Sequence, residues 1–230
     1  RVAQGKANEV ILTKLGKMEI PDLSDNEAVQ MGHVMEPVIG RLAQSRLGIE
    51  LTKIEEALTH PKEAWLRSHF DFAGKENGKT VLVECKNYNA GVRNKFDSES
   101  GIIPAADMAQ LIHEAAVHNV ERVVLAVLFG GQNFEVFTFT IEEAQKEQLI
   151  KDMAAFWARV ETKQPLEPTS TAETKLLYTA SSPTMITAPQ SVEQACIALR
   201  TVKDQIKALE EREEQLSAAI QGFMQNNSEL

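Results

Sequence analysis

The stretch TVLVECK, residues 80–86, is the most informative in the sequence, because an apolar run there ends in a charged pair. Residues 81–83 are apolar on both faces of a strand, which is typical of a central strand covered on both sides. The dipeptide Asn77-Gly78 precedes it and is a strong hairpin signal. We therefore predict that residues 80–86 pair with a preceding strand, and that this neighbour carries Asp71 to the same region.

The end of the predicted strand carries groups that can perform chemistry. Side chains two residues apart on a strand share a face, so Glu84 and Lys86 project together, with Asp71 on the neighbouring strand. Two carboxylates provide the hard oxygen ligands that Mg²⁺ prefers, and a metal-bound water is activated for hydrolysis. Lys86 can orient or deprotonate that water or stabilise charge on a phosphate, and the Cys85 carbonyl offers a further ligand. The simpler alternative is a structural ion pair between Glu84 and Lys86.

Upstream of this strand, the spacing of apolar residues predicts two helices. The first covers about residues 2–17, and the second begins at Ser24, which forms a capping box with Glu27. Pro37 lies inside the second helix and is expected to kink it.

Downstream, helices and strands alternate. We predict a polar loop over residues 87–102, a helix from Pro104, strands over 120–129 and 134–141, and a helix over 142–161. These elements predict an α/β (α+β) domain with a central mixed sheet flanked by helices.

The last third of the chain changes in composition. Four of the eight prolines fall within residues 164–190, among many Ser and Thr residues, which indicates a linker. Beyond it, a capping box of Ser191 and Gln194 opens a run of apolar residues at heptad spacing, interrupted at Glu213. The predicted organisation is a core over 1–163, a linker over 164–190 and a helical appendage over 191–230. The apolar stripe of that helix can fold back on its own domain, pair with a neighbouring subunit or receive a partner, and we favour docking within the same oligomer.

Composition excludes several classes of protein. A chain of 230 residues with 25% charged side chains and no long apolar run is neither disordered nor membrane-spanning. Two cysteines, Cys85 and Cys196, provide no disulfide framework, so we expect a cytoplasmic protein. The net charge of −9 argues against a generally basic nucleic-acid binder, although a nuclease needs only a local basic groove.

Several ordered motifs together resemble the PD-(D/E)xK nuclease superfamily. More closely, they resemble the phage λ-exonuclease-like alkaline exonucleases, or YqaJ-type viral recombinase family, over about residues 5–160. The matching elements are Asp25-Asn26-Glu27-Ala28, Gly32, Glu36-Pro37, Asp71, Glu84-Cys85-Lys86 and Gln110. The family also carries a Gly-Gly-Ser element just upstream of where this sequence begins, so we expect the N-terminal part of the core to be missing.

The resemblance implies roles for these residues. Asp71, Glu84 and the Cys85 carbonyl would bind the metal, and Lys86 would be the catalytic lysine. Glu36 would support a metal or its water, and Gln110 would position the nucleophile or the scissile phosphate. In the polar loop, Arg93 and Lys95 are candidates for DNA phosphate contacts, although solvated surface is the slightly favoured interpretation.

The implied activity is Mg²⁺-dependent exonuclease digestion of one strand of linear duplex DNA, 5′→3′, with Mn²⁺ as a substitute metal. It would leave 3′ single-stranded tails for an annealing protein, in a phage or prophage protein of a bacterial cytoplasm. By resemblance the chain would form a trimeric ring around DNA. Two alternatives stay open: an endonuclease of restriction or repair type, and a non-catalytic DNA-binding or assembly protein on the same fold.

Overall fold

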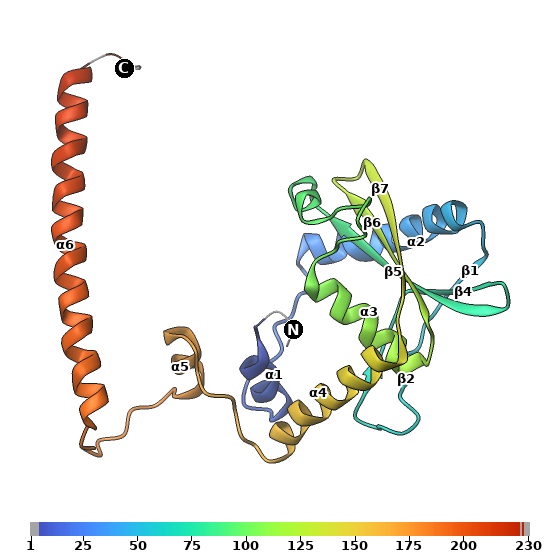
Figure 1. Ribbon diagram of the computed structural model, residues 1–230, viewed down its shortest axis with the longest axis horizontal. Coiled ribbons are helices and arrows are strands. Elements are labelled where there is room, and N and C mark those ends of the chain that lie inside the picture. The colour runs from blue at the N-terminus through green and yellow to red at the C-terminus, as the bar shows by residue number, and fades with distance from the viewer. Residues whose placement is uncertain (1–4, 226, 228–230) are drawn as a thin grey trace. The chain divides into compact units, whose positions relative to one another are not determined.

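The computed structural model describes residues 5–225 and 227, and the chain divides into two units, Arg1–Thr179 and Ala180–Leu230. Within the described residues, no helix is both long and apolar enough to cross a membrane. In the first unit, a mixed sheet lies between helices, whereas the second unit contains one long helix, α6 (Gln190–Met224) (Figure 1).

The sheet has the strand order β1-β4-β5-β6-β7 among the described residues. Its central strand β5 pairs antiparallel with β4 and parallel with β6, and β1 and β7 form the antiparallel edges. A separate short hairpin joins β2 and β3. The strand bounds are β1 (Leu51–Lys53), β2 (Leu58–Thr59), β3 (Arg67–Ser68), β4 (Phe72–Glu76), β5 (Lys79–Tyr88), β6 (Arg122–Phe129) and β7 (Asn133–Thr140).

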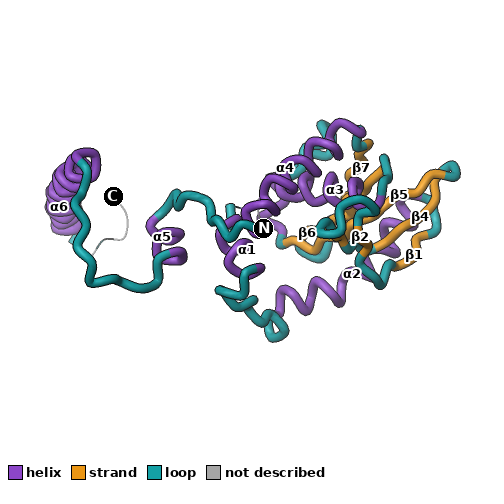
Figure 2. The backbone as a smooth tube through the Cα atoms, turned by 90° about the horizontal axis from the view of Figure 1, so that it is seen from below, coloured by secondary structure: helices purple, strands orange, loops and turns teal. Residues whose placement is uncertain are grey.

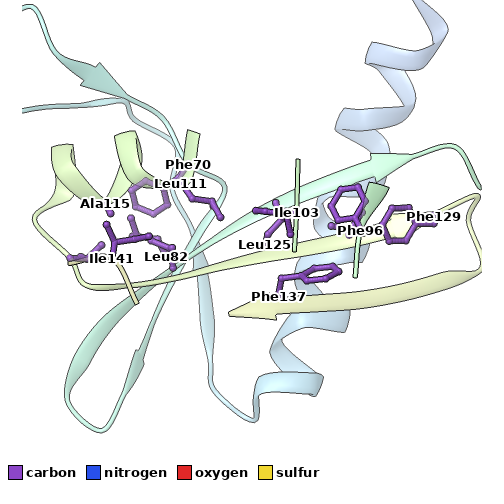
Figure 3. Close-up of a cluster of buried hydrophobic side chains, with 13 residues drawn as sticks. Phe70, Leu82, Phe96, Ile103, Leu111, Ala115, Leu125, Phe129, Phe137 and Ile141 are labelled. Carbon is purple, nitrogen blue, oxygen red and sulfur yellow. The ribbon is translucent and has the colours of Figure 1, made fainter. Parts of the chain in front are cut away.

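Helices cover both faces of the sheet (Figure 2). Helix α2 (Glu27–Leu47) packs on one face, where the buried side chains include Ile39 and Ala43. On the other face lies α3 (Ala105–His118), which connects the parallel strands β5 and β6 and buries Leu111 and Ala115 (Figure 3). Alternation along β5 divides its side chains between these two cores, because neighbouring residues of a strand point to opposite faces.

Three further α-helices lie in the first unit. Helix α4 (Glu143–Glu161) packs on α3, α1 (Ala7–Lys14) contacts α4, and α5 (Thr171–Leu177) contacts α1. The side chain of Asn8 in α1 is buried and bridges to the backbone of Leu166, accepting its N–H at 2.8 Å and donating to its carbonyl at 3.3 Å. The structure therefore groups residues 164–179 with the first unit, and α5 lies inside the predicted linker; the predicted domain boundaries stay a prediction.

Several local predictions were wrong. The N-cap of α2 is Asn26, not Ser24, and its side chain accepts from the N–H groups of Ala28 and Val29. The Ser191 capping box is also absent, because α6 begins at Gln190 after Pro189 and has no side-chain cap.

The predicted polar loop over 87–102 is partly regular. Strand β5 continues to Tyr88, and a 3₁₀ helix, η2 (Ala90–Lys95), follows it. The predicted first helix is shorter than expected, spanning Ala7–Lys14, and residue 2 lies outside the described residues.

Helix α2 approaches the sheet closely at Gly40. A methyl group there would lie 2.5 Å from the ring of Phe72, which is itself buried. We expect Gly40→Ala to lower the free energy of unfolding by about 1–3 kcal/mol, because overpacking forces neighbouring groups to shift. Chemical denaturation measures this.

Gly32 provides the matched control in the same helix, since a methyl group there meets no atom within 4 Å. Gly32→Ala should leave stability unchanged or raise it by up to ~1 kcal/mol, because alanine favours the helix. Equal losses for both variants would contradict the close packing of α2 on β4.

Candidate active site

A row of polar side chains joins β5 to α3 across an otherwise apolar interface. On β5 they alternate with core residues, and on α3 they recur at helical spacing, so both sets face the gap between the two elements. Such groups are stable inside a protein only when they are hydrogen-bonded. The row consists of Glu84, Lys86 and Tyr88 from β5 and Asp107, Gln110 and Glu114 from α3.

Glu84, Lys86 and Gln110 form a closed hydrogen-bonded triangle. The Lys86 ammonium donates to Glu84 Oε1 at 2.7 Å and to Gln110 Oε1 at 3.0 Å. The amide of Gln110 donates from Nε2 to the same Glu84 oxygen at 2.6 Å. Glu84 is only 6% exposed, and its second oxygen, Oε2, is buried and has no hydrogen-bond partner. One oxygen of this carboxylate thus accepts two hydrogen bonds, and the other accepts none.

Asp71 lies just before β4, at the side of Glu84. Its Oδ2 accepts the backbone N–H of Cys85 at 2.7 Å, which fixes the carboxylate against β5. Burial, followed by repulsion from Glu84 and from Glu36, raises the pKa of Asp71 to about 7. The rise reflects first the removal of the carboxylate from water and then the nearby negative charges, and a bound cation would stabilise the ionised form.

Glu36, on α2, approaches the site from the opposite face of the sheet. Its Oε1 lies 3.1 Å from the ammonium of Lys53 on β1. The pKa of Lys53 is raised, chiefly by this hydrogen bond to Glu36 and by its charge. The charge of Glu36 contributes to the raised pKa of Asp71, so the two carboxylates lie near each other. Glu36 is also paired with Lys53.

Glu114 is a part of the site that sequence reasoning missed. It is 2% exposed, and its Oε1 accepts from Gln110 Nε2 at 2.8 Å. Burial, and secondly the charge of Glu84, raises the pKa of Glu114 to about 9, so the group is protonated at neutral pH. The signal in the sequence was its position four residues after Gln110, which places both on one helix face.

Tyr88 and Asp107 close the other end of the row and were also missed. The Tyr88 hydroxyl donates to Asp107 Oδ1 at 2.8 Å, and Asp107 is buried. Burial, and then Asp107, raises the pKa of Tyr88, so the hydroxyl keeps its proton.

Comparison with known proteins identifies the family. Residues 4–121 match the family model of the YqaJ-like viral recombinase domain, which is about half of the chain. The chain belongs to the YqaJ-like viral recombinase family. The family and the fold class predicted from the sequence are therefore confirmed. No curated protein shows significant sequence similarity to the chain.

Solved structures show the same fold. An alkaline exonuclease from Laribacter hongkongensis, LHK-Exo, has 18% identity and a TM-score of 0.56, with 77% of this chain and 86% of that one covered. It is also known in complex with dAMP. A phage-related exonuclease from Haemophilus somnus 129PT has 11% identity and a TM-score of 0.53, with 69% and 81% covered.

The YqaJ-like match covers every residue proposed for the chemistry, including Glu36, Asp71 and Gln110. Within the described residues, no cluster of three or more His, Cys, Asp or Glu side chains has the geometry of a metal site. Mg²⁺ does not need such a cluster, because it is commonly held by one or two carboxylates and several waters. The unpartnered Oε2 of Glu84 and the crowded carboxylate of Asp71 fit that requirement.

Cys85 contributes no thiolate to this site of the YqaJ-like domain. Its side chain packs with the core under α2, on the face opposite Glu84. Burial, followed by the charge of Asp71, raises the pKa of the Cys85 thiol, so it stays protonated. Only its backbone carbonyl remains a candidate ligand.

The two basic residues of η2 differ in their surroundings. Arg93 forms an ion pair with Glu135 and donates to the Phe96 carbonyl at 3.1 Å. Lys95 is exposed, so it is the freer of the two to meet a phosphate.

Proposed function

We propose that the chain is a Mg²⁺-dependent DNA exonuclease that digests one strand of linear duplex DNA, in the 5′→3′ direction. The observation that carries the proposal is that Asp71 is fixed against β5 at Cys85, next to Glu84 and Lys86, while one carboxylate oxygen of that pair, Glu84 Oε2, has no hydrogen-bond partner. The shared fold with alkaline exonucleases supports the same activity, and dAMP, bound by LHK-Exo, is the kind of nucleotide that stepwise DNA hydrolysis releases.

Asp71, Glu84 and the Cys85 carbonyl would hold the metal, with Glu36 supporting it or a water. When bound, Mg²⁺ or Mn²⁺ activates water and polarises the phosphoryl oxygen. The fixed position of Asp71 against the Cys85 N–H leaves little reorganisation for metal binding.

Lys86 acts as a cation in this proposal. Burial by itself would lower the pKa of Lys86, but the carboxylate of Glu84 outweighs it, and the net pKa is raised. A protonated amine can donate a hydrogen bond to the nucleophile or the phosphate, but it cannot remove a proton. Gln110 bonds both Lys86 and Glu84 and would keep them in register with the scissile phosphate.

Glu114 would control the orientation of the Gln110 amide. Because Glu114 accepts from Gln110 Nε2, the amide oxygen is turned toward Lys86. We expect Glu114→Leu, which lacks an acceptor, to lower the turnover rate about tenfold, as loss of a supporting hydrogen bond commonly does. Steady-state kinetics on duplex DNA measures this.

The control for that prediction is Glu114→Gln, which keeps both the size and an acceptor oxygen. It should restore near wild-type turnover, with KM unchanged in both variants. Equal losses in the two variants would exclude orientation of Gln110 as the role of Glu114.

DNA contacts, oligomerisation and a protein partner are further parts of the proposed function. We propose that Lys95 and, less directly, Arg93 contact phosphates beside the site. A trimeric ring around the duplex and an annealing protein that coats the 3′ tail complete the proposal, and they rest on the family resemblance. We propose that the chain is a phage or prophage protein that acts in the cytoplasm of a bacterial host.

The test is a time course with Mg²⁺ on linear duplex labelled at either the 5′ or the 3′ end, beside covalently closed circular duplex. We expect early release of the 5′ label, a retained 3′ strand and an intact circle. Cleavage of the circle would establish an endonuclease instead. Duplex binding without cleavage of either substrate would favour a non-catalytic DNA-binding or assembly protein.

A further inference from the structure

We propose that α6 pairs with α6 of a second copy of this chain, as an antiparallel two-stranded coiled coil. The inference goes beyond the proposed function and holds whichever activity the first unit has. Because three copies cannot all pair two by two within one trimeric ring, the pairing would join chains of different rings. It rests on the apolar stripe, the side-chain sizes and the charges of the helix.

The stripe of α6 is too extensive to stay in water. Its positions recur at alternating steps of three and four residues, the spacing of a two-stranded coiled coil, and all are apolar except Glu213, which lies between Leu209 and Leu216. The larger ones are between 47% and 78% exposed. Among the described residues of the second unit, α6 is the only helix or strand, so that unit provides nothing to cover them. The stripe consists of Val192, Ala195, Leu199, Val202, Ile206, Leu209, Leu216, Ile220 and Phe223.

The sizes of these side chains favour an antiparallel pair. The stripe is symmetric about the middle of the helix, so an antiparallel partner centred there places every apolar layer opposite another stripe position. At the ends, Ala195 then faces Ile220 of the second copy, and Val192 faces Phe223 of the second copy. Small residues opposite large ones fill space evenly. A parallel pair would instead place Ala195 against Ala195 and Phe223 against Phe223.

The charges favour the same orientation. Glu213 occupies a stripe position, so a parallel pair would bury Glu213 against Glu213, and like charges inside an interface are costly. In the antiparallel pair Glu213 faces Val202 of the second copy, next to Lys203 of the second copy.

The flanking residues provide the complementary charges. Lys203 and Glu210 border the same side of the stripe, and the antiparallel register brings Lys203 beside Glu210 of the second copy, twice by symmetry. The ion pair within α6, Lys207 with Glu211 at 4.0 Å, lies on the outer side and does not compete.

Disulfide mapping in the full chain tests the arrangement. In a Cys196→Ser background, the double variant Leu199→Cys and Leu216→Cys is oxidised mildly and digested with trypsin, which cleaves after Arg200 and Arg212. We expect links between position 199 of one chain and position 216 of another to exceed self-links at least about tenfold, because a disulfide needs Cα atoms within about 7 Å. Within one helix the two positions are about 26 Å apart, so a link cannot form inside one chain.

The matched control is the double variant Asp204→Cys and Glu211→Cys in the same background. These positions lie at equal levels in the proposed pair, but on its outer surface, so they should not link. Predominant links of 199 to 199 or 216 to 216 would overturn the proposal in favour of a parallel pair. Absence of links between chains would also overturn it, since the stripe would then be covered by the first unit of its own chain or by a different protein.

Discussion

Replacing Lys86 with alanine should lower the rate of DNA cleavage by about two to four orders of magnitude, the range for loss of a positioned proton-handling or charge-stabilising group. The ammonium of Lys86 bonds both Glu84 and Gln110, so it lies at the point where those two side chains meet. The variant should still bind Mg²⁺, because both carboxylates remain. Single-turnover kinetics on end-labelled duplex measures the loss.

Lys79 provides the matched control for this variant. It lies at the start of the same strand, where its ammonium pairs with the exposed Glu121 at 2.9 Å. Lys79→Ala should keep the wild-type rate. Circular dichroism of both variants establishes that the fold is intact. A Lys86→Ala enzyme that cleaves at the normal rate would remove Lys86 from the mechanism.

The second large effect is expected for Asp71→Asn, which should weaken Mg²⁺ binding at least about tenfold, because affinity at such sites depends on the number of charged ligands. Cleavage should fall with it. The asparagine side chain can still accept the Cys85 N–H, so the local hydrogen bond is kept. Calorimetry with Mg²⁺ or Mn²⁺ measures the affinity, and wild-type affinity in the variant would contradict the assignment of Asp71 as a ligand.

The same substitution should make the stability of the metal-free protein depend less on pH. Burial and the charge of Glu84 raise the pKa of Asp71 to about 7, well above its ordinary value of 3.8. The folded state then binds this proton more tightly than the unfolded state, so its stabilising contribution is complete below pH ~4 and is lost as pH rises toward 7. Asp71→Asn removes that loss. Thermal unfolding of the metal-free proteins between pH 4 and 8 compares the two slopes, with Glu147→Gln as a control for an exposed carboxylate outside the site.

The sequence predicted the centre of the fold well because its signals there were strong and local. The apolar run 81–83 and the Asn77-Gly78 turn define β5 and its hairpin with β4, and both are present in the structure. Alternation along a strand then required Glu84 and Lys86 to share a face. Gln110 was found only through the order of motifs, since a glutamine on a helix carries little signal by itself.

The missed residues depended on packing between distant elements. To place Tyr88, Asp107 and Glu114 in the site, one must know which face of α3 packs against β5. No local sequence pattern determines that face. The helix starts failed for a different reason. Several residues near a helix end can serve as N-cap, and here the side chain of Asn26, not that of Ser24, accepts the first N–H groups of α2.

The buried side-chain amide of Asn8 determines where the protein can be truncated without loss of its hydrogen bonds. Its side chain is hydrogen-bonded to the backbone of Leu166, so the segment that follows α4 is part of the first unit, as α1 is. A shortened protein intended for crystallisation or for a fusion should therefore retain both the helix at the beginning and the chain through Thr179. A protein that ends at residue 163 would lack Leu166, and the buried side-chain amide of Asn8 would lose its hydrogen bonds to that residue.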